Sequence, residues 1–368
     1  MTTGEGSAAR RLRWRSEGLP APARVGVADD ATPADAAFRR LRKGERLLYT
    51  GDYHNARQLL AAVGRRLRPP APQPSLAEAF RAERRFRRLE RDTLSGLLVP
   101  VEGDLRVALR RGPEVAAAAL REVWGPPDGE PSTLPLRELL GMIGAHEWRR
   151  KGVQVAALGA AVHPHYGVFA PVRSEYVTLV AEALAARRLA GRTAFDVGTG
   201  TGVLAFLAAR AGARARATDD DPRAVACARE NAERLGLAGQ VEVERRDLFP
   251  EGRADLVLCN PPWLPAEPLG PLDHAVYDPG GRFLAAFLER LPEHLAPGGE
   301  AFLVISDLAE RLGLRPAGAL LASIAAAGLR VAERREARPV HPRARDADDP
   351  LHAARAAEVT TLYVLGTG

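Results

Sequence analysis

From Arg192 to the end of the chain, short apolar runs alternate with stretches that carry helical periodicity. This alternation is typical of a doubly wound sheet, in which largely parallel strands are joined by helices that cover both faces. Each crossover should be right-handed, so the ligand site is expected at the carboxyl ends of the first strands. The expected strands are residues 194–197, 214–218, 241–244, 256–259, 301–305, 329–335 and 359–365.

The composition fits a folded protein rather than a fibrous or membrane chain. Hydrophobic residues make up 46% and charged residues 27% of the 368 residues, close to the average of globular proteins. With two cysteines, no long apolar run and no secretory signal pattern, the chain is expected to be cytoplasmic, without a disulfide framework or a membrane span. Residues 1–150 hold 27 Lys and Arg against 19 Asp and Glu, which keeps a nucleic-acid partner open.

A glycine-rich loop follows the first expected strand of this region and precedes a helix. Glycines at such a turn permit a tight backbone path and let a ligand approach the main chain. The spacing is GxGxG and the loop has no lysine, which argues against a dinucleotide fold and against a P-loop. The residues predicted to bind a cofactor here are Asp196, Gly198, Thr199, Gly200 and Gly202.

Acidic residues follow the next two expected strands. Asp219 and Asp220 stand at the end of the second strand, where a carboxylate accepts the two ribose hydroxyls of an adenosine ligand. Asp221 is predicted to cap the helix that follows. Asp247 comes after the third strand and is predicted to accept the adenine amino group, while Leu248 and the aromatic residue after it cover the ring.

The fourth expected strand is followed by the loop Asn260-Pro261-Pro262-Trp263. Because two prolines fix the backbone and supply no N–H, the carbonyl groups of Asn260 and Pro261 are expected to project as acceptors. The side-chain oxygen of Asn260 and the carbonyl oxygen of Pro261 would then orient a planar nitrogen by accepting its N–H groups. Asn260 and Pro261 are therefore predicted to be catalytic, with Asn260 also touching the cofactor, and Pro262 and Trp263 are predicted to bind the flat substrate group.

Taken together, these segments resemble the class I methyltransferases that depend on S-adenosylmethionine. The Asn-Pro-Pro-aromatic element is similar to that of enzymes that methylate glutamine, adenine or exocyclic guanine nitrogens. The nearest pattern is that of the protein glutamine methyltransferases that act on translation release factors, and it covers roughly residues 165–366, including similar segments at 171–175 and 277–281. Trp263 stands where that family usually has Tyr, the 171–175 segment is spaced differently by one residue, and the amino-terminal region is much longer.

The resemblance implies an α/β fold with a Rossmann-like seven-stranded sheet in the order 3-2-1-4-5-7-6, preceded by a mostly helical amino-terminal domain. It also implies S-adenosyl-L-methionine as the cofactor, S-adenosyl-L-homocysteine as the product, and substrate contacts by Arg173 and Tyr277. The expected organisation is a disordered tail at 1–30, a mostly helical substrate-recognition domain at 31–150, a connecting segment with the first catalytic-domain helix at 151–190, and the cofactor-binding catalytic domain at 191–368.

The segment His163-Pro164-His165-Tyr166 lies just before the sheet, and His165 and Tyr166 are expected to wall the acceptor pocket. Two histidines in this spacing have no carboxylate or cysteine beside them in the sequence, and methyl transfer needs no metal. The prediction is therefore that no metal binds here.

The expected activity is methylation of a planar amide or heteroaromatic nitrogen, in a protein side chain or a small nitrogenous metabolite. One alternative is methylation of an RNA or DNA base, with the basic first 150 residues holding phosphates and a base flipped toward Trp263. Another is O-methylation of a small molecule handled by His163, His165 or Tyr166. A non-catalytic binding protein is disfavoured because every donor position is intact. The sequence leaves the identity of the acceptor and the oligomeric state open.

Overall fold

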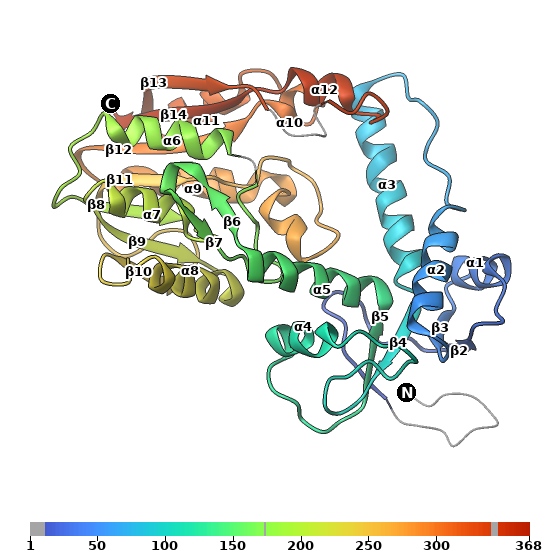
Figure 1. Ribbon diagram of the computed structural model, residues 1–368. Helices are drawn as coiled ribbons and strands as arrows, with labels where there is room; N and C mark the ends of the chain where they lie inside the picture. Colours follow the sequence, from blue (N-terminus) through green and yellow to red (C-terminus); the bar gives the residue numbers. More distant parts are fainter. Residues whose placement is uncertain (1–11, 173, 340–344) are drawn as a thin grey trace. The chain divides into compact units, whose positions relative to one another are not determined.

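The computed structural model describes residues 12–172, 174–339 and 345–368. The described residues form two compact units: unit 1 holds residues up to 72 together with 81–148, and unit 2 holds residues 73–80 together with those from 149 on. Figure 1 labels the elements of both units.

Unit 2 is built on a seven-stranded sheet with the strand order β10-β9-β8-β11-β12-β14-β13. Numbered along the chain this is 3-2-1-4-5-7-6, the predicted order. Neighbouring strands are parallel from β10 to β12, and β14 pairs antiparallel with both β12 and β13. The strands are β8 (Thr193–Val197), β9 (Arg214–Asp219), β10 (Val241–Arg245), β11 (Ala254–Cys259), β12 (Leu295–Ser306), β13 (Leu329–Ala337) and β14 (Thr360–Thr367).

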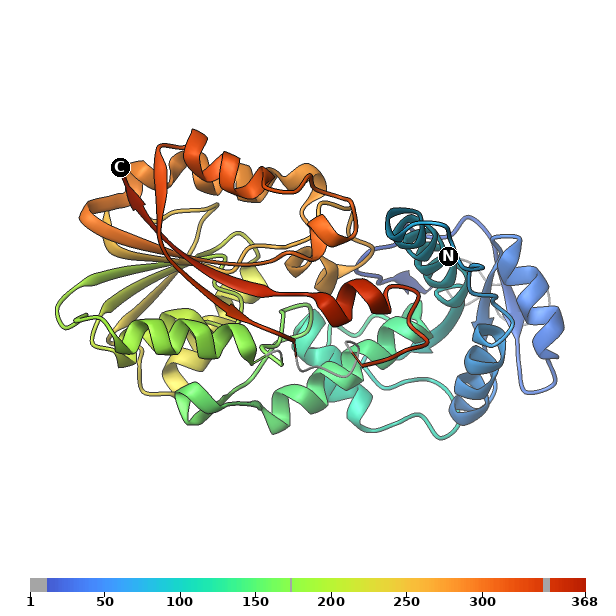
Figure 2. The same cartoon turned by 90° about the horizontal axis from the view of Figure 1, so that it is seen from above.

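Helices cover both faces of this sheet because successive strand residues point to opposite sides. On one face, Ala194, Leu256 and Leu258 pack with apolar residues of α6, α7 and α8. On the other face, Phe195 and Val257 pack with residues of α9 and α11. Figure 2 shows the sheet lying between these two helix layers. The helices are α6 (Glu175–Ala185), α7 (Val203–Arg210), α8 (Pro222–Arg234), α9 (Arg282–His294) and α11 (Ala319–Ala326).

Shorter elements complete unit 2. The strands β6 (Val153–Val155) and β7 (Ala160–Val162) form an antiparallel pair around η1 (Ala156–Leu158). Two 3₁₀ turns follow β11, namely η2 (Pro271–Ala275) and η3 (Pro279–Gly281). The remaining helices are α10 (Leu308–Arg311) and α12 (His352–Ala357).

Unit 1 carries a five-stranded sheet in addition to the helices that the sequence predicts, with the strand order β1-β5-β4-β3-β2. Its strands are β1 (Arg13–Trp14), β2 (Val25–Ala28), β3 (Arg46–Tyr49), β4 (Leu97–Val101) and β5 (Ser132–Pro135). The helices of this part of the chain are α1 (Ala34–Arg42), α2 (Tyr53–Gly64), α3 (Leu76–Leu94), α4 (Val115–Trp124) and α5 (Leu136–Lys151), of which α3 and α5 each contain a point of division between the units.

The expected disordered tail at 1–30 is wrong from residue 12 onward, and residues 1–11 lie outside the described residues. Leu12 is 4% exposed, and the indole Nε1 of Trp14 donates to the carbonyl of Leu19 at 2.8 Å. β1 pairs with β5 and β2 pairs with β3, both in parallel. The apolar residues here are too few to show a period, yet pairing with strands later in the chain orders them.

Candidate active site

The glycine loop joins β8 to α7 at the carboxyl edge of the sheet. Gly198, Gly200 and Gly202 have φ values of 71°, 55° and 91°, a region in which only glycine is unstrained. A Cβ at Gly202 would lie 2.2 Å from the ring of Phe206, whereas a Cβ at Gly200 would meet no described atom within 4 Å. The loop is thus closed against the protein at Gly202 and open at Gly200, as a backbone that receives a ligand requires.

Two carboxylates hold this loop. Asp196 is 1% exposed, and its Oδ2 accepts the hydroxyl of Thr199 at 2.6 Å and the N–H of Ala205 at 3.0 Å. Asp219 accepts the N–H of Gly200 on Oδ2 at 3.0 Å. Burial raises the pKa of both carboxyl groups to about 6, and the charge of Asp219 adds to the rise at Asp196. Asp196 is enclosed and positions the loop, and its predicted contact with the cofactor stays a prediction.

The other predicted donor residues divide between the site edge and the core. Asp221 caps α8 by accepting the N–H of Arg223 at 2.8 Å, as predicted, and Asp220 and Asp247 are exposed at the carboxyl edge. Leu248 is buried with φ at 58°, and its carbonyl accepts the hydroxyl of Thr218.

The aromatic residue expected to cover a ligand ring is Phe249, and that expectation is wrong. Phe249 is fully buried and stacks on Phe287, with ring centroids 5.2 Å apart. Leu248 packs in the same core cluster. The apolar pair after Asp247 therefore anchors the loop to the sheet, because the core below β10 and β11 offers more burial than the surface.

The Asn260–Trp263 loop leaves the same edge of the sheet from β11. The indole Nε1 of Trp263 donates to Oδ1 of Asn260 at 3.0 Å, which ties the ring to the amide and fixes the amide orientation. Trp263 is half-buried against both core clusters of the sheet, Pro261 is buried and Pro262 is half-buried. The loop is thus rigid, and one lone pair of Asn260 Oδ1 already accepts the indole N–H of Trp263.

The chain after this loop returns to the glycine loop. Leu264 forms an isolated bridge with Tyr277, and the carboxylate of Asp278 accepts the N–H groups of Phe283 at 3.0 Å and Leu284 at 3.2 Å. A Cβ at Gly198 would lie 3.5 Å from the ring of Phe283. Phe283 is a site neighbour that the sequence reasoning missed, and the helix start after Asp278 is the signal that points to it.

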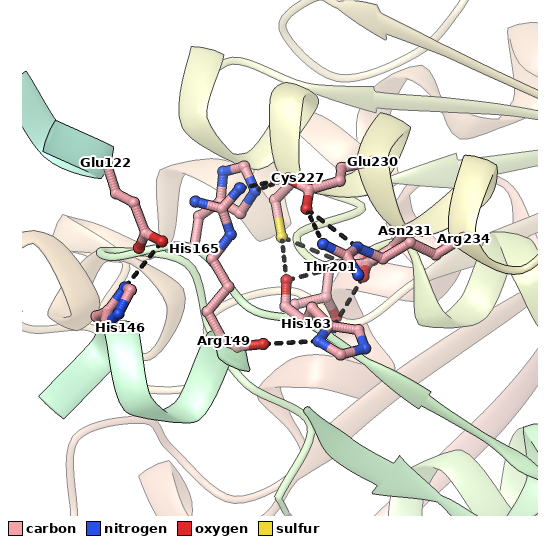
Figure 3. Close-up of polar contacts among 10 residues, drawn as sticks. All are labelled: Glu122, His146, Arg149, His163, His165, Thr201, Cys227, Glu230, Asn231 and Arg234. Atoms are coloured by element: carbon pink, nitrogen blue, oxygen red, sulfur yellow. Dashed lines mark hydrogen bonds and ion pairs between the residues drawn. The ribbon is translucent and has the colours of Figure 1, made fainter. Parts of the chain in front are cut away.

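His163 and His165 contact residues of α8, and Asn231 of the same helix contacts Thr201 of the glycine loop (Figure 3). The backbone N–H of His163 donates to Oδ1 of Asn231 at 2.8 Å, and Nε2 of His165 lies 2.8 Å from Oε2 of Glu230. The guanidinium of Arg223 lies over the ring of Tyr166 at 5.9 Å. The imidazole of His165 therefore already contacts a carboxylate through Nε2, which leaves that nitrogen less available to the methyl-accepting substrate.

Glu230 is the charged centre of this group. Its Oε2 is 2.5 Å from Nη2 of Arg149, and its Oε1 is 2.7 Å from Nη2 of Arg234. Burial alone raises the pKa of Glu230, but Arg234, His165 and Arg149 outweigh it and lower the pKa to about 2. Glu230 therefore stays ionised, and through His165 it holds the segment that precedes α6 against α8.

Some predicted features fall outside these contacts. Arg173, a predicted substrate contact, is not among the described residues. Within the described ranges, no group of three or more His, Cys, Asp or Glu side chains is placed to hold a metal ion. No helix in the described part of the chain is long and apolar enough to cross a membrane.

Several known proteins are similar to parts of this chain. Residues 159–315 match the family described as methyltransferase small domain. The chain is 42% identical over 149 residues to a ribosomal protein L11 methyltransferase from Pelotomaculum thermopropionicum, covering 40% of this chain and 41% of that protein. It is 41% identical over 129 residues to a release factor glutamine methyltransferase from Cereibacter sphaeroides, covering 31% of this chain and 46% of that protein.

A longer match extends beyond the shared domain. The chain is 30% identical over 250 residues to a release factor glutamine methyltransferase from Gloeobacter violaceus, covering 62% of this chain and 82% of that protein. Among solved structures, a methyltransferase from Pyrococcus furiosus matches with 18% identity and a TM-score of 0.43, covering 61% of this chain and 98% of that one. The chain spans less than half the length of the first two relatives and most of the third.

The chain belongs to the class I methyltransferases that use S-adenosylmethionine. The residues present fit that cofactor. Asp219 stands at the end of β9 with both carboxylate oxygens facing backbone donors, and the space at Gly200 is open.

Proposed function

We propose that this protein transfers the methyl group of S-adenosylmethionine to a planar nitrogen, an amide or heteroaromatic nitrogen of a protein side chain or of a small nitrogenous metabolite. One observation carries the proposal. β11 lies beside β8 with Cys259 opposite Val197, so Asn260 and Gly198 leave the sheet side by side. The loop that suits a planar nitrogen therefore adjoins the loop that suits the methyl donor.

The donor contacts are assigned by position along the carboxyl edge. Asp219 accepts the ribose hydroxyls, with Asp220 beside it, and Asp247 accepts the adenine amino group. The backbone of Gly198, Gly200 and their neighbours carries the methionine end, while Asp196 holds that backbone through Thr199. Leu248 contributes through its backbone because its side chain is buried.

The acceptor contacts come from the next loop. The bound cofactor supplies a methyl group on a positively charged sulfur. Oδ1 of Asn260 and the carbonyl oxygen of Pro261 accept the N–H groups of the acceptor and direct its lone pair toward that methyl. Transfer of the methyl group would use this lone pair to form the nitrogen–carbon bond, and the nitrogen would then release its proton to water. Trp263, fixed by Asn260, stacks on the flat group with Pro262, and Tyr277 lines the same pocket.

A protein side-chain amide is the acceptor that we favour. Two of the relatives are named for glutamine methylation of release factors and one for methylation of ribosomal protein L11. A cytoplasmic location goes with such substrates. A nucleic-acid base is the second candidate, because the first 150 residues carry an excess of basic side chains.

The deciding experiment offers S-adenosylmethionine with a deuterated methyl group to the full chain together with glutamine-containing peptides, RNA and heteroaromatic amines. We expect the label on a side-chain amide nitrogen, located by tandem mass spectrometry. Labelling of RNA with unmodified peptides would replace the protein acceptor by a base, and labelling on oxygen would overturn the role of Asn260.

A further inference from the structure

One buried amide on α8 connects two segments that lie far apart in the sequence. Asn231 is 1% exposed. Its Oδ1 accepts the backbone N–H of His163 at 2.8 Å, and its Nδ2 donates to the carbonyl of Thr201 at 3.2 Å. Figure 3 shows the amide between these two partners.

Thr201 belongs to the glycine loop, and the loop is held at three consecutive residues. Thr199 is held by the carboxylate of Asp196 and Gly200 by the carboxylate of Asp219, both from strand ends below the loop. Thr201 is held by Asn231 from the neighbouring helix. The first two contacts come from residues of β8 and β9, whereas the third comes from α8 and holds the loop against that helix.

The chemistry of the position calls for an amide. Asn carries an acceptor and a donor at fixed positions on one planar group, whereas an ionised Asp can only accept and Leu can do neither. Both partners are backbone groups, and a buried backbone carbonyl that loses its donor is costly. The 163–165 segment is also held by Glu230 through His165, so the amide couples the loop to a fixed support.

We propose that Asn231 is a positioning residue for the methyl donor: without touching the cofactor, it holds the glycine loop, through the Thr201 carbonyl, in the conformation that binds it. This inference rests on the proposed function only through donor binding. Loss of the Asn231 amide should therefore lower the affinity for the methyl donor and leave turnover nearly normal once the donor is bound.

The test compares Asn231→Ala with Ala232→Gly. Ala232 is the next residue of α8, is buried in the core and has no polar side-chain group, so its change loosens the helix without removing the amide that contacts Thr201. For Asn231→Ala we expect the KM for S-adenosylmethionine and the Kd for S-adenosylhomocysteine, measured by calorimetry, to rise tenfold or more, with kcat within threefold. For Ala232→Gly both donor constants should stay within twofold while the thermal midpoint falls.

Asn231→Asp provides the second variant, because it keeps the shape and the acceptor for His163 and can donate to Thr201 only when protonated. Its donor affinity should therefore exceed that of Asn231→Ala at low pH and approach it as the pH rises. Titration of Asp196 and Asp219, which face the loop, is shared by both variants and cancels in the comparison. Hydrogen exchange at Gly200 to Gly202 should quicken in Asn231→Ala and remain unchanged in Ala232→Gly.

Equal donor affinity of Asn231→Ala and the native protein overturns the inference, and so do identical donor affinities of the Asp and Ala variants at every pH. A parallel fall of kcat and affinity that tracks stability in both Asn231→Ala and Ala232→Gly would reduce Asn231 to a packing residue. If the native protein itself binds neither S-adenosylmethionine nor S-adenosylhomocysteine, the proposed function fails first, which is a distinguishable result.

Discussion

At the scale of single residues, the raised pKa of Asp219 makes the stability of the protein depend on pH. The pKa of Asp219 in the folded chain is about 6 against an ordinary value of 3.8, so the folded state binds this proton more tightly than the unfolded state. The ionised group therefore lowers stability above pH 6, and the loss disappears as the pH falls toward 4. We expect the stability advantage of Asp219→Asn over the native protein to shrink by about 1 kcal/mol between pH 7 and pH 5, measured by urea unfolding.

The matched control for this titration is Asp255→Asn. The pKa of Asp255 is lowered, chiefly because its carboxylate accepts the N–H of Thr193, so it stays ionised throughout this range. Its effect on the free energy of unfolding should be flat from pH 7 to pH 5. A flat profile for Asp219→Asn as well would mean that burial does not raise the pKa of Asp219.

The acceptor loop gives a second prediction, which separates the amide from the ring. Asn260→Ala should lower kcat a hundredfold or more with nearly unchanged donor affinity, because one positioned polar group contributes about 3 kcal/mol in a transition state. Trp263→Phe keeps an aromatic ring but loses the N–H that fixes Asn260, so kcat should fall about fivefold, the value of roughly 1 kcal/mol for one hydrogen bond.

Trp263→Ala removes the ring as well, and its KM for the acceptor should rise in addition. Trp148→Phe is the control, because Trp148 is exposed and lies in unit 1. If Trp263→Phe turns over at the native rate, the indole N–H does not matter and stacking alone explains the residue.

The residues of the donor site differ in how well the sequence predicts them. The sequence predicts the local structure at Asp219, Asp221 and the glycines, because it depends on neighbours within a few positions, namely a strand end, a helix start and a turn. The cofactor contacts of Asp219 and the glycines stay predictions. Asn231 and Phe283 are missed because their partners, Thr201 and Gly198, are 30 or more positions away. No local pattern marks such a pair, and the fold alone brings it together.

At the scale of elements, the start of α9 has a single side chain that caps it. Asp278 accepts two first-turn N–H groups, those of Phe283 and Leu284, from a buried position. We expect Asp278→Ala to lower the free energy of unfolding by about 1 to 2 kcal/mol, and to weaken donor binding because Phe283 then shifts from Gly198. Urea unfolding and calorimetry measure the two effects.

Asp278→Asn is the matched variant. Its single amide oxygen can accept only one of the two N–H groups that Oδ1 and Oδ2 of Asp278 accept, so it should recover part of the stability that Asp278→Ala loses. If Asn and Ala variants are equally unstable, the charge rather than the cap explains Asp278, through interaction with cations such as Arg315 nearby.

Elements of unit 2 follow from the sequence far better than those of unit 1. All seven strands of the large sheet lie where their apolar runs predict, because short apolar runs bounded by turns and alternating with helical stretches favour strands. In unit 1, β3 (Arg46–Tyr49) falls where a continuing helix is expected. The four residues of β3, between α1 and the cap of α2 at Asp52, are too few to show a helical or strand periodicity of apolar residues. Their pairing with β2 and β4 makes them a strand.

At the scale of the whole molecule, the sequence predicts two domains with different functions, but the boundary that it predicts differs from the one in the structure. The 31–150 region is assigned to substrate recognition because every donor residue lies beyond residue 190. The packing of unit 2 begins earlier, at Arg149, and it also takes in residues 73–80. Ala79 and Phe80 share a core cluster with Leu264 and Leu308, which no composition shift along the chain reveals.

This division predicts the behaviour of two truncated proteins. Residues 149–368 keep Arg149 and β6, so the contacts of His163 and Glu230 remain, and the protein should bind S-adenosylhomocysteine within about threefold of the full chain. Residues 161–368 lose Val153, Val155 and Leu158 from the core, at about 1.5 to 3 kcal/mol for each buried side chain, and should bind weakly or unfold.

The longer truncated protein then tests what unit 1 does. If residues 31–150 select the substrate, residues 149–368 should bind the donor normally yet methylate the acceptor at least a hundredfold more slowly than the full chain. Because this protein also lacks Phe80, the full chain with Phe80→Ala measures how much of the loss comes from loosened packing under Leu264. We expect that share to be small. Turnover at the native rate by residues 149–368 would instead make unit 1 a separate module, and the acceptor would be chosen by the Asn260–Trp263 loop alone.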